Sequence, residues 1–212
     1  MSTPTDLRSR KRLATRQGIS HAATRLFHEH GFDHVTVDQI AAAADVGRMT
    51  VFNHFPRKED MFFDRDEEGR DALRQAIHER DAGVSPVEAL RGLAHRLVAQ
   101  NSPFVNFSAQ SKDFIRTIEG SETLKARARA IRDELAEVVA QALAETVDRP
   151  TPDVDAQLAA GLWLAAWTVA FLNAHRTFGL TQDTVAAQKT FLSLVDRGCA
   201  GVTAALDGTP YV

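Results

Sequence analysis

The residues of this chain best suited to chemistry lie between positions 48 and 53, and that chemistry is hydrogen bonding to nucleic-acid bases. The Arg48 guanidinium can donate two hydrogen bonds to O6 and N7 of guanine. Met49 offers an apolar contact to a thymine methyl group, and Thr50 and Asn53 can donate to a phosphate or to a base. An ordinary helical hairpin with a polar outer face would carry the same residues, so their spacing alone leaves both interpretations open.

A helix-turn-helix over residues 36–55 would present these side chains. Thr36 is typical of an N-cap, and it precedes a short helix expected at 37–43. A turn then leads to a second helix at 47–53, the element that enters the major groove in such motifs. The apolar residues expected to pack the two helices together are Val37, Ile40, Ala41, Val46, Val51, Phe52 and Phe55.

About 40 residues, Ala22 to Met61, follow a longer pattern in order and spacing. It begins with residues 26–32 (LFHEHGF), continues with the threonine-capped helix and the Ile-Ala pair at 36–41, and closes with residues 50–59 (TVFNHFPRKE). This stretch resembles the DNA-binding domain of the tetracycline-repressor (TetR) family. The resemblance is far more specific than a generic helix-turn-helix pattern.

The resemblance implies a role for each matching position. Thr36, Thr50, His54 and Lys58 correspond to phosphate contacts, because helix N-termini and cationic or hydroxyl groups bind anions. The family usually has serine where this chain has Gly47, and usually tyrosine where it has Phe52, so Phe52 is expected to pack while Asn53 takes a polar role. The complete set of expected DNA-binding residues is Arg10, Thr36, Arg48, Met49, Thr50, Phe52, Asn53, His54 and Lys58.

The net charge of −3 is unevenly distributed. Residues 1–60 carry a net charge of +2 and residues 61–212 a net charge of −5. The first sixteen residues hold Arg8, Arg10, Lys11, Arg12 and Arg16 against a single acidic residue, Asp6. The resemblance implies that such a basic arm follows the DNA backbone or the minor groove, and a solvated, disordered tail is the alternative.

The remaining pattern predicts an all-α, nine-helix TetR-like fold, because alternating β-branched residues are missing and Ala, Leu, Arg and Glu dominate. We expect an N-terminal arm and helix-turn-helix DNA-binding domain over residues 1–56 and a ligand-binding and dimerisation domain over 57–212. Prolines and glycines, among them Pro103, Gly120 and Gly179, separate the later elements. The nine predicted helices cover roughly 10–30, 37–43, 47–53, 57–80, 86–100, 104–118, 122–146, 153–176 and 182–205.

The last two predicted helices are the most apolar part of the chain. Residues 158–172 are hydrophobic nearly all round, which is typical of a helix buried on more than one side. The resemblance implies that this pair forms a four-helix bundle with its copy in a homodimer, and a purely intramolecular core is the alternative. A palindromic operator also favours a dimer, because two recognition helices must reach two half-sites.

Aromatic residues in the second domain raise the possibility of an effector pocket. Trp163, Trp167 and Phe171 follow one helical stripe at i, i+4 and i+8, a pattern that a solid core produces equally well. The family places a ligand cavity among its middle helices, so we expect a lipophilic small-molecule effector. Asn106, Asn173, His175 and Arg176 are the polar residues considered as its partners. The expected ligand-binding residues are Phe104, Phe107, Phe114, Trp163, Trp167, Phe171 and Arg176.

Several other classes of function are disfavoured. Cys199 is the single cysteine, so neither an internal disulfide nor a multi-cysteine zinc site can form. His28 and His30 do not share a helix face, and neither a glycine-rich phosphate loop nor a nucleophile–base pair is recognisable. We therefore expect no enzyme activity, no cofactor and no metal.

No uninterrupted apolar run reaches the roughly 18 residues of a membrane span, and no secretory signal is visible. These observations predict a cytoplasmic protein without a membrane partner. The function expected is a ligand-responsive repressor, released from a double-stranded DNA operator by its effector through a shift between two conformational states. The alternative is a DNA-binding regulator that no small molecule gates.

Overall fold

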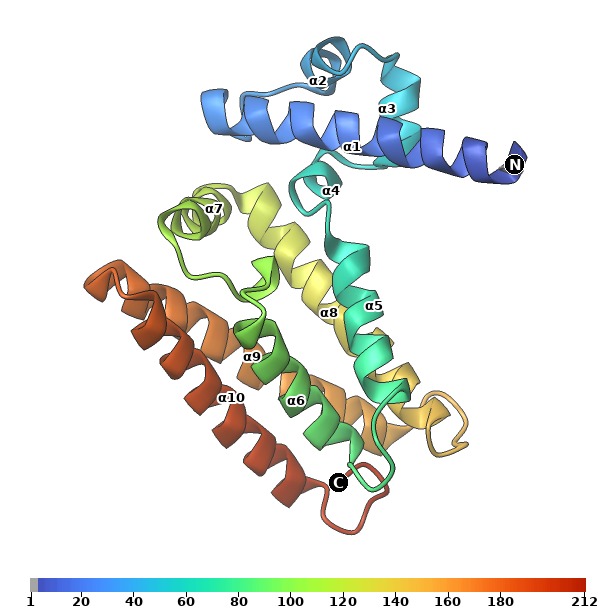
Figure 1. Ribbon diagram of the computed structural model, residues 1–212, viewed down its shortest axis with the longest axis vertical. Helices are drawn as coiled ribbons and strands as arrows, with labels where there is room; N and C mark the ends of the chain where they lie inside the picture. Colours follow the sequence, from blue (N-terminus) through green and yellow to red (C-terminus); the bar gives the residue numbers. More distant parts are fainter. Residues whose placement is uncertain (1–3) are drawn as a thin grey trace. The chain divides into compact units, whose positions relative to one another are not determined.

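The computed structural model describes residues 4–212, with side chains from Arg8 onward, and all its regular structure over that range is helical (Figure 1). These residues form two compact units. Unit 1 comprises the residues up to Asp66 together with Thr117–Arg127, and unit 2 comprises Glu67–Arg116 and Ala128–Val212. The first unit therefore extends beyond the boundary expected at residue 56 and includes a second segment of the chain.

Unit 1 contains α1 (Pro4–His30), α2 (Val37–Ala43), α3 (Arg48–His54) and α4 (Lys58–Phe62). The predicted cap at the start of α2 is confirmed. The Thr36 hydroxyl accepts from the backbone N–H of Gln39 at 3.3 Å, and the Gln39 side chain accepts from the backbone N–H of Thr36 at 2.8 Å. This reciprocal capping box fixes the first turn of α2.

The basic N-terminal segment is helical from Pro4, so the alternative interpretation as a disordered tail does not hold for residues 4–9. Proline is well tolerated in the first turn of a helix, and arginine, lysine and leucine in the following residues have high helix propensity. Residues 1–3 lie outside the described part of the chain. The basic side chains are therefore carried on one continuous helix with the rest of α1.

One apolar core joins the helices of unit 1. Its rings include Phe27 and Phe32, whose centroids lie 5.0 Å apart. Each buried aliphatic or aromatic side chain contributes roughly 1.5–3 kcal/mol of transfer free energy, and this fixes α2 and α3 on α1. The buried members are Ile19, Ala23, Phe27, Phe32, Val35, Ile40, Ala41, Val51, Phe55, Met61 and Leu124.

Residues 117–127, the end of one helix and the start of the next, complete unit 1. Leu124 is fully buried in the same core. The Ser121 hydroxyl donates to the Asp33 carboxylate at 2.9 Å, and Arg127 Nε donates to the Asp60 carboxylate at 2.9 Å. The Arg127 side chain is only 12% exposed, so this ion pair is largely withdrawn from solvent screening.

The single helix predicted at 57–80 is wrong, because the structure divides it into α4 and α5 (Asp66–His78) with a turn at 63–65. Arg16 donates to the backbone carbonyl of Asp64 at 3.4 Å, and the Ser20 hydroxyl donates to the Asp64 carboxylate. Both donors lie on α1. The turn is thus stabilised by contacts to a helix more than forty residues away in the sequence, and a local helical pattern cannot predict such contacts.

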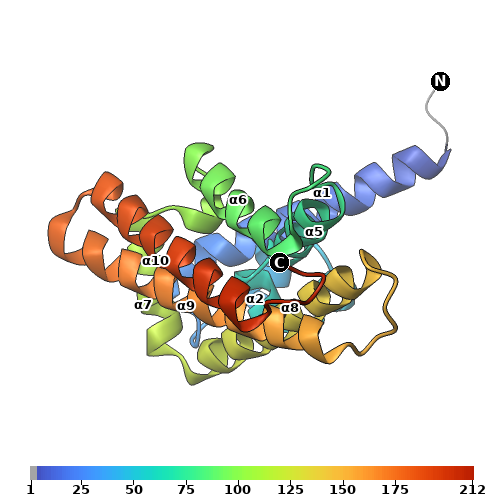
Figure 2. The same ribbon diagram turned by 90° about the horizontal axis from the view of Figure 1, so that it is seen from below.

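Unit 2 holds α5 after its first residue, α6 (Pro86–Ala99), a short 3-10 helix η1 (Pro103–Val105), the first part of α7 (Ala109–Gly120), most of α8 (Glu122–Glu145), α9 (Val154–Thr181) and α10 (Thr184–Ala205). Helices α9 and α10 lie side by side in Figures 1 and 2 and form the most extensive helix pair. The described chain thus has ten α-helices where nine were predicted, which remains consistent with the expected all-α fold.

Helix α9 runs five residues past its predicted end, through Gly179 to Thr181. Gln182 ends it in the left-handed region, with φ at 56° and its N–H bonded to the Phe178 carbonyl at 2.8 Å. Glycine inside a helix costs about 1 kcal/mol relative to alanine. Burying the Phe178 ring in the unit 2 core outweighs that cost.

Helix α9 is, by length and composition alone, apolar enough to cross a membrane, although polar residues interrupt its apolar runs. The expectation from uninterrupted runs missed this. Only 33% of its most apolar window is buried within the chain. The core helix of a water-soluble protein can have the same composition, and α9 packs along α10. Much of the apolar surface of α9 nevertheless stays exposed within one chain.

Candidate nucleic-acid interface

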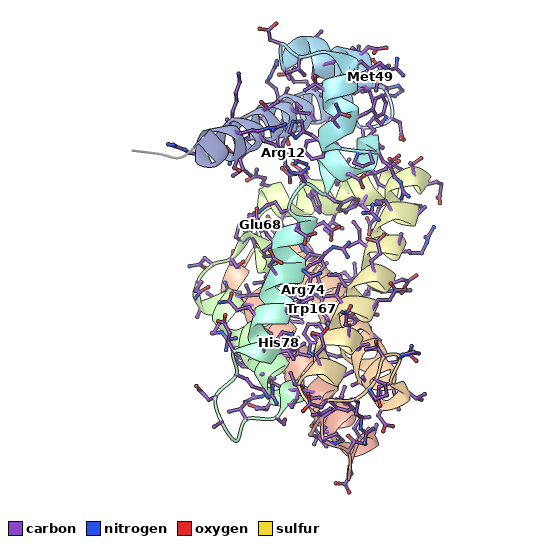
Figure 3. All side chains as sticks on the ribbon, turned by 90° about the vertical axis from the view of Figure 1, so that its right-hand side faces the viewer. Arg12, Met49, Glu68, Arg74, His78 and Trp167 are labelled. Carbon is purple, nitrogen blue, oxygen red and sulfur yellow. The ribbon has the colours of Figure 1, made fainter. Side chains whose placement is uncertain are left out.

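Helix α3 has two chemically distinct faces. Its inner residue Val51 is fully buried, and Phe55, which ends the helix, is 1% exposed. Met49, in the first turn of α3 (Figure 3), is 70% exposed. Arg48 and Asn53 are exposed as well, and Thr50 is partly exposed. The apolar face thus fixes the orientation of a short helix whose outward side chains are the predicted base-reading residues.

The turn before α3 is tight. Asp45 adopts a left-handed conformation with φ at 52°, and the N–H of Val46 donates to the Ala41 carbonyl at 3.0 Å. Gly47 is the N-cap and provides no side-chain cap. A Cβ at Gly47 would contact only Thr50 Oγ1, at 3.9 Å, so the serine expected from the resemblance would fit.

Arg48 is held by two neighbours. Its Nη1 donates to both carboxylate oxygens of Asp38, on α2, at 3.1 and 2.9 Å. Its guanidinium carbon lies 5.6 Å from the centre of the Phe52 ring, one turn along α3. Both charged side chains are mostly exposed, 59% for Arg48 and 65% for Asp38. Phe52 therefore supports an arginine, and the contact between Asp38 and Arg48 was not predicted from the sequence.

Lys58, at the start of α4, is partly committed within unit 1. Its Nζ donates to the backbone carbonyls of Phe32 at 2.9 Å and Val35 at 3.1 Å, and lies 4.2 Å from the centre of the Phe32 ring. An ammonium has three donors. One N–H is left for the phosphate contact predicted for Lys58, while the other two tie the loop after α1 to α4.

His54 closes α3 beside two arginines of α1. Its backbone carbonyl accepts from Arg16 Nη1 at 2.6 Å, and the Arg16 guanidinium carbon lies 4.0 Å from the centre of the Phe55 ring. Burial, followed by the positive charges of Arg12 and Arg16, lowers the pKa of the His54 imidazole. At neutral pH this side chain is a neutral donor, and Arg16 braces α3 instead of belonging to the arm.

The other predicted contacts lie on exposed parts of unit 1. Thr36 is exposed at the N-terminus of α2. Arg10 and Arg12 are exposed on α1, where Figure 3 labels Arg12. The predicted DNA-binding set is thus distributed over α1, the first turns of α2 and α4, and the whole of α3.

Unit 2 brings together four of the seven residues predicted to bind a ligand. The Phe107 ring lies 6.1 Å from Phe171, and the Trp163 ring lies 5.1 Å from Trp167, centre to centre. Phe191 joins the two pairs, at 5.8 Å from Phe107 and 5.0 Å from Trp167. Phe191 is not among the residues predicted to bind a ligand, since nothing local in the sequence indicates which rings it meets.

The other three predicted ligand residues lie on η1, α7 and α9. Phe104, in η1, lies close to Gly69, since a Cβ at Gly69 would meet its ring at 3.6 Å. Phe114 is 38% exposed on α7. Arg176 is exposed on α9.

His175 lies at the edge of the aromatic cluster, and both of its ring nitrogens are buried without a hydrogen-bond partner in the described part of the chain. Its ring centre is 5.0 Å from that of Phe107 and 4.5 Å from that of Phe171. Burial lowers the pKa of His175 to about 4. A neutral imidazole offers one donor and one acceptor, and leaving both unused in a protein interior is costly.

Two open hollows of unit 2 lie elsewhere. One, of about 650 Å³, lies between α6 and α10 and is lined by charged residues that include Arg91 and Asp196. The other, of about 580 Å³, lies between α5 and α6. Cys199 borders the first, and burial raises the pKa of its thiol to about 11, so it is not a reactive thiolate at neutral pH. Residues 4–212 contain no grouping of His, Cys, Asp or Glu suited to a metal ion.

An apolar stripe runs along the outside of α9. Its residues recur at intervals of three, four or seven positions, which places them on one face of the helix. Leu158 is 46% exposed and Val169 is 52% exposed, far more than apolar residues in a core. The exposed apolar residues of this face are Val154, Leu158, Leu162, Val169 and Leu172.

Comparison with known sequences places these features in a family. Residues 19–64 match the sequence profile described as bacterial regulatory proteins, tetR family. TcmR of Streptomyces glaucescens, an HTH-type transcriptional regulator, is 38% identical over 93 residues, which make up 43% of this chain and 41% of TcmR. The match thus spans about two fifths of the length of this curated relative.

Solved structures are similar over nearly the whole chain. A TetR-family transcriptional regulator from Mesorhizobium loti has a TM-score of 0.56 and 19% identity, covering 92% of this chain and 97% of the other. FadR of Thermus thermophilus, a TetR-family repressor solved with lauroyl-CoA, has a TM-score of 0.50 and 27% identity, covering 86% of this chain and 94% of FadR. The predicted TetR-like fold is confirmed.

Proposed function

Since the chain belongs to the TetR family of bacterial regulatory proteins, we propose that it represses transcription as a homodimer bound to a palindromic DNA operator and leaves the operator when a lipophilic small molecule binds. The relatives are transcriptional regulators, not enzymes. A DNA-bound regulator of a bacterial chromosome acts in the cytoplasm.

The observation that carries this proposal is the two-faced helix α3. Val51 is buried and holds α3 against the core of unit 1, while the side chains of Arg48 and Met49 are exposed to solvent. A short helix of this kind fits the major groove, where the arginine meets guanine and the methionine meets thymine. Phe52 acts through Arg48, and Asn53 supplies a further polar contact.

Phosphate contacts would set the register of α3 in the groove. Thr36 lies at the N-terminus of α2, where free N–H groups favour an anion. Thr50, the neutral His54 and the remaining N–H of Lys58 add donors around α3. Arg10 adds positive charge from α1. These contacts position the protein, and only the base contacts carry sequence information.

A second copy of this chain is the proposed occupant of the apolar face of α9, with α10 contributing to the same seam. Two thirds of the most apolar window of α9 are not buried within one chain, which is unusual for a helix of this composition. Pairing α9 and α10 with their symmetry mates would bury that surface. It would also supply two recognition helices for a two-fold symmetric operator.

The aromatic cluster with His175 is the proposed effector site. Its rings accept an apolar body, and the two unpartnered imidazole nitrogens would bind a hydroxyl, amide or carbonyl group. The complex of the similar repressor FadR with lauroyl-CoA supports a lipophilic ligand. The ligand changes DNA affinity only by the difference between its affinities for the two states of the protein.

A regulator without a small-molecule effector is the second candidate. The ring contacts within the cluster favour it, because rings that contact one another at 5.0–6.1 Å leave little space between them. Thermal unfolding with and without lauroyl-CoA and lauric acid separates the two candidates. A rise in the unfolding temperature that also weakens DNA binding supports gating, and no change in either quantity supports the second candidate.

DNA binding itself is tested by footprinting the purified protein on the DNA upstream of its own gene. We expect protection of a palindrome whose half-sites lie about one helical turn apart. Arg48→Ala should weaken the protection of this site without altering the helical content. Wild-type protein that protects no site at low salt would contradict the proposed function.

A further inference from the structure

We propose that Asp38 determines the base specificity of the recognition helix by fixing the guanidinium of Arg48 for contact with guanine. The inference rests on the proposed DNA-binding function and assigns a role to a residue that does not itself need to touch a base. It is drawn from three side chains of unit 1, which are Asp38 on α2 and Arg48 and Phe52 on α3.

The hydrogen bonds leave one edge of the guanidinium available. Both bonds to Asp38 start from Nη1 of Arg48, at 3.1 and 2.9 Å. A guanidinium has five N–H groups, so the Nε and Nη2 groups remain for another partner. These two nitrogens lie along a single edge, and their spacing matches the O6 and N7 acceptors of guanine.

Phe52 restricts the same guanidinium from another side. Its ring centre lies 5.6 Å from the Arg48 guanidinium carbon, within the range of a cation–π contact. Arg48 is otherwise 59% exposed, and a free arginine would lose much rotamer freedom on binding a base. Fixing it beforehand reduces that loss. Phe52 thus has a use in this chain that does not require the missing tyrosine hydroxyl.

The charge of Asp38 explains why the pair would raise specificity more than affinity. Asp38 is 65% exposed at the start of α2, beside the expected phosphate contact of Thr36. A carboxylate there weakens binding to every duplex through repulsion by phosphates. Only at a site with guanine opposite Arg48 does the arginine–guanine contact compensate for this repulsion, so the ratio of specific to non-specific binding increases. A carboxylate that merely sequestered Arg48 would weaken binding to all duplexes equally.

The test uses the full chain and synthetic duplexes. Wild-type protein selects its preferred sequences from a pool of randomised duplexes, and Arg48→Ala identifies the base pair whose preference depends on Arg48. Dissociation constants are then measured for the selected duplex, for its three variants at that base pair and for a scrambled duplex. Asp38→Ala is compared with Glu29→Ala, which removes the same charge from an exposed residue of α1. Circular dichroism verifies that every variant is folded.

We expect wild type and Glu29→Ala to prefer guanine by roughly 10–100-fold at that base pair, and Asp38→Ala to prefer it by about threefold or less. At the same low salt concentration, Asp38→Ala should also bind the scrambled duplex a few-fold more tightly than wild type does. An unchanged preference for guanine in Asp38→Ala would overturn the inference. If this variant also bound all duplexes more tightly, Asp38 would merely sequester Arg48 in the wild-type protein. Wild-type protein that enriches no sequence would overturn the proposed function, and with it this inference.

Discussion

Gly198 on α10 lies directly against Ala166 on α9. A Cβ at position 198 would overlap the Ala166 methyl group and lie 3.6 Å from the Ala166 Cα. Alanine faces glycine at this point, so the two longest apolar helices of unit 2 approach each other without an intervening side chain. Close packing of α9 on α10 therefore depends on the absence of a single methyl group.

Gly198→Ala should lower the free energy of unfolding by roughly 1–3 kcal/mol, because overpacking forces the two helices apart. Gly201→Ala on the same helix is the matched control. A Cβ at Gly201 would meet nothing within 4 Å, so this change should raise the free energy of unfolding by up to about 1 kcal/mol through helix propensity. Urea unfolding measures both. Equal stability of the two variants would show that the close approach does not limit packing.

His175→Leu should stabilise the ligand-free protein at neutral pH. The change removes two buried nitrogens that have no hydrogen-bond partner and fills similar space with an apolar side chain. We expect a gain of about 1–2 kcal/mol in the free energy of unfolding. If the imidazole binds an effector as proposed, the same variant should lose its thermal response to a lipophile that carries a hydroxyl or amide. A destabilised variant would indicate that the imidazole nitrogens are satisfied in solution.

The same variant should change the pH dependence of stability. The pKa of His175 is lowered from its ordinary value of 6.5 to about 4, so the unfolded chain binds a proton between these values while the folded chain does not. Stability is therefore lost as pH falls from about 6.5 to about 4. This difference corresponds to about 3 kcal/mol. As the pH falls across that range, the thermal unfolding temperature should decrease more steeply for wild type than for His175→Leu. Parallel curves would contradict the lowered pKa of His175.

The helix-turn-helix was predictable because its determinants are local. Thr36 and Gln39 cap α2 through neighbouring residues, and Val51 marks the inner face of α3 within one turn. Both helices accordingly begin and end within one residue of their predicted bounds, at Val37–Ala43 and Arg48–His54.

Features that depend on distant residues were missed. The turn after α4 depends on donors from α1 to Asp64, and two N–H groups of Lys58 are used by carbonyls of Phe32 and Val35. The Asp38–Arg48 pair joins two helices across ten positions. Residue types alone indicate that such groups can bond, but the tertiary fold decides which of them meet.

Val169→Glu should convert the proposed dimer into a monomer. Val169 belongs to the apolar face of α9, lies near the middle of the helix and is 52% exposed in a single chain. A carboxylate buried in a symmetric seam would meet its own copy, so the dimerisation constant should weaken by at least roughly 100-fold. Leu13→Glu, on exposed α1, introduces the same charge outside α9 and α10. Sedimentation equilibrium measures both variants, and a Val169→Glu protein that remains dimeric would exclude this face as the seam.

The basic residues of α1 divide into two groups that salt titration can separate. Arg16 bonds to the His54 carbonyl and packs on Phe55, so its removal should destabilise unit 1. Arg10 and Arg12 are exposed near the start of α1 and are proposed to meet the DNA backbone. Removing them in a chain that begins at Leu13 should reduce the slope of log K against log salt by roughly 1 for each phosphate that the shortened chain no longer binds.

Arg129→Ala is the control for this titration, because Arg129 is an exposed arginine of unit 2 outside the proposed DNA-binding set. It removes one positive charge without removing a proposed phosphate contact, so its slope should equal that of wild type. Because α1 begins at Pro4, its basic side chains lose less conformational freedom on contact with the DNA backbone than those of a disordered tail would. The contribution of each such contact to the salt dependence should therefore be easier to measure. A slope that stays unchanged in the chain beginning at Leu13 would mean that the start of α1 does not contact DNA.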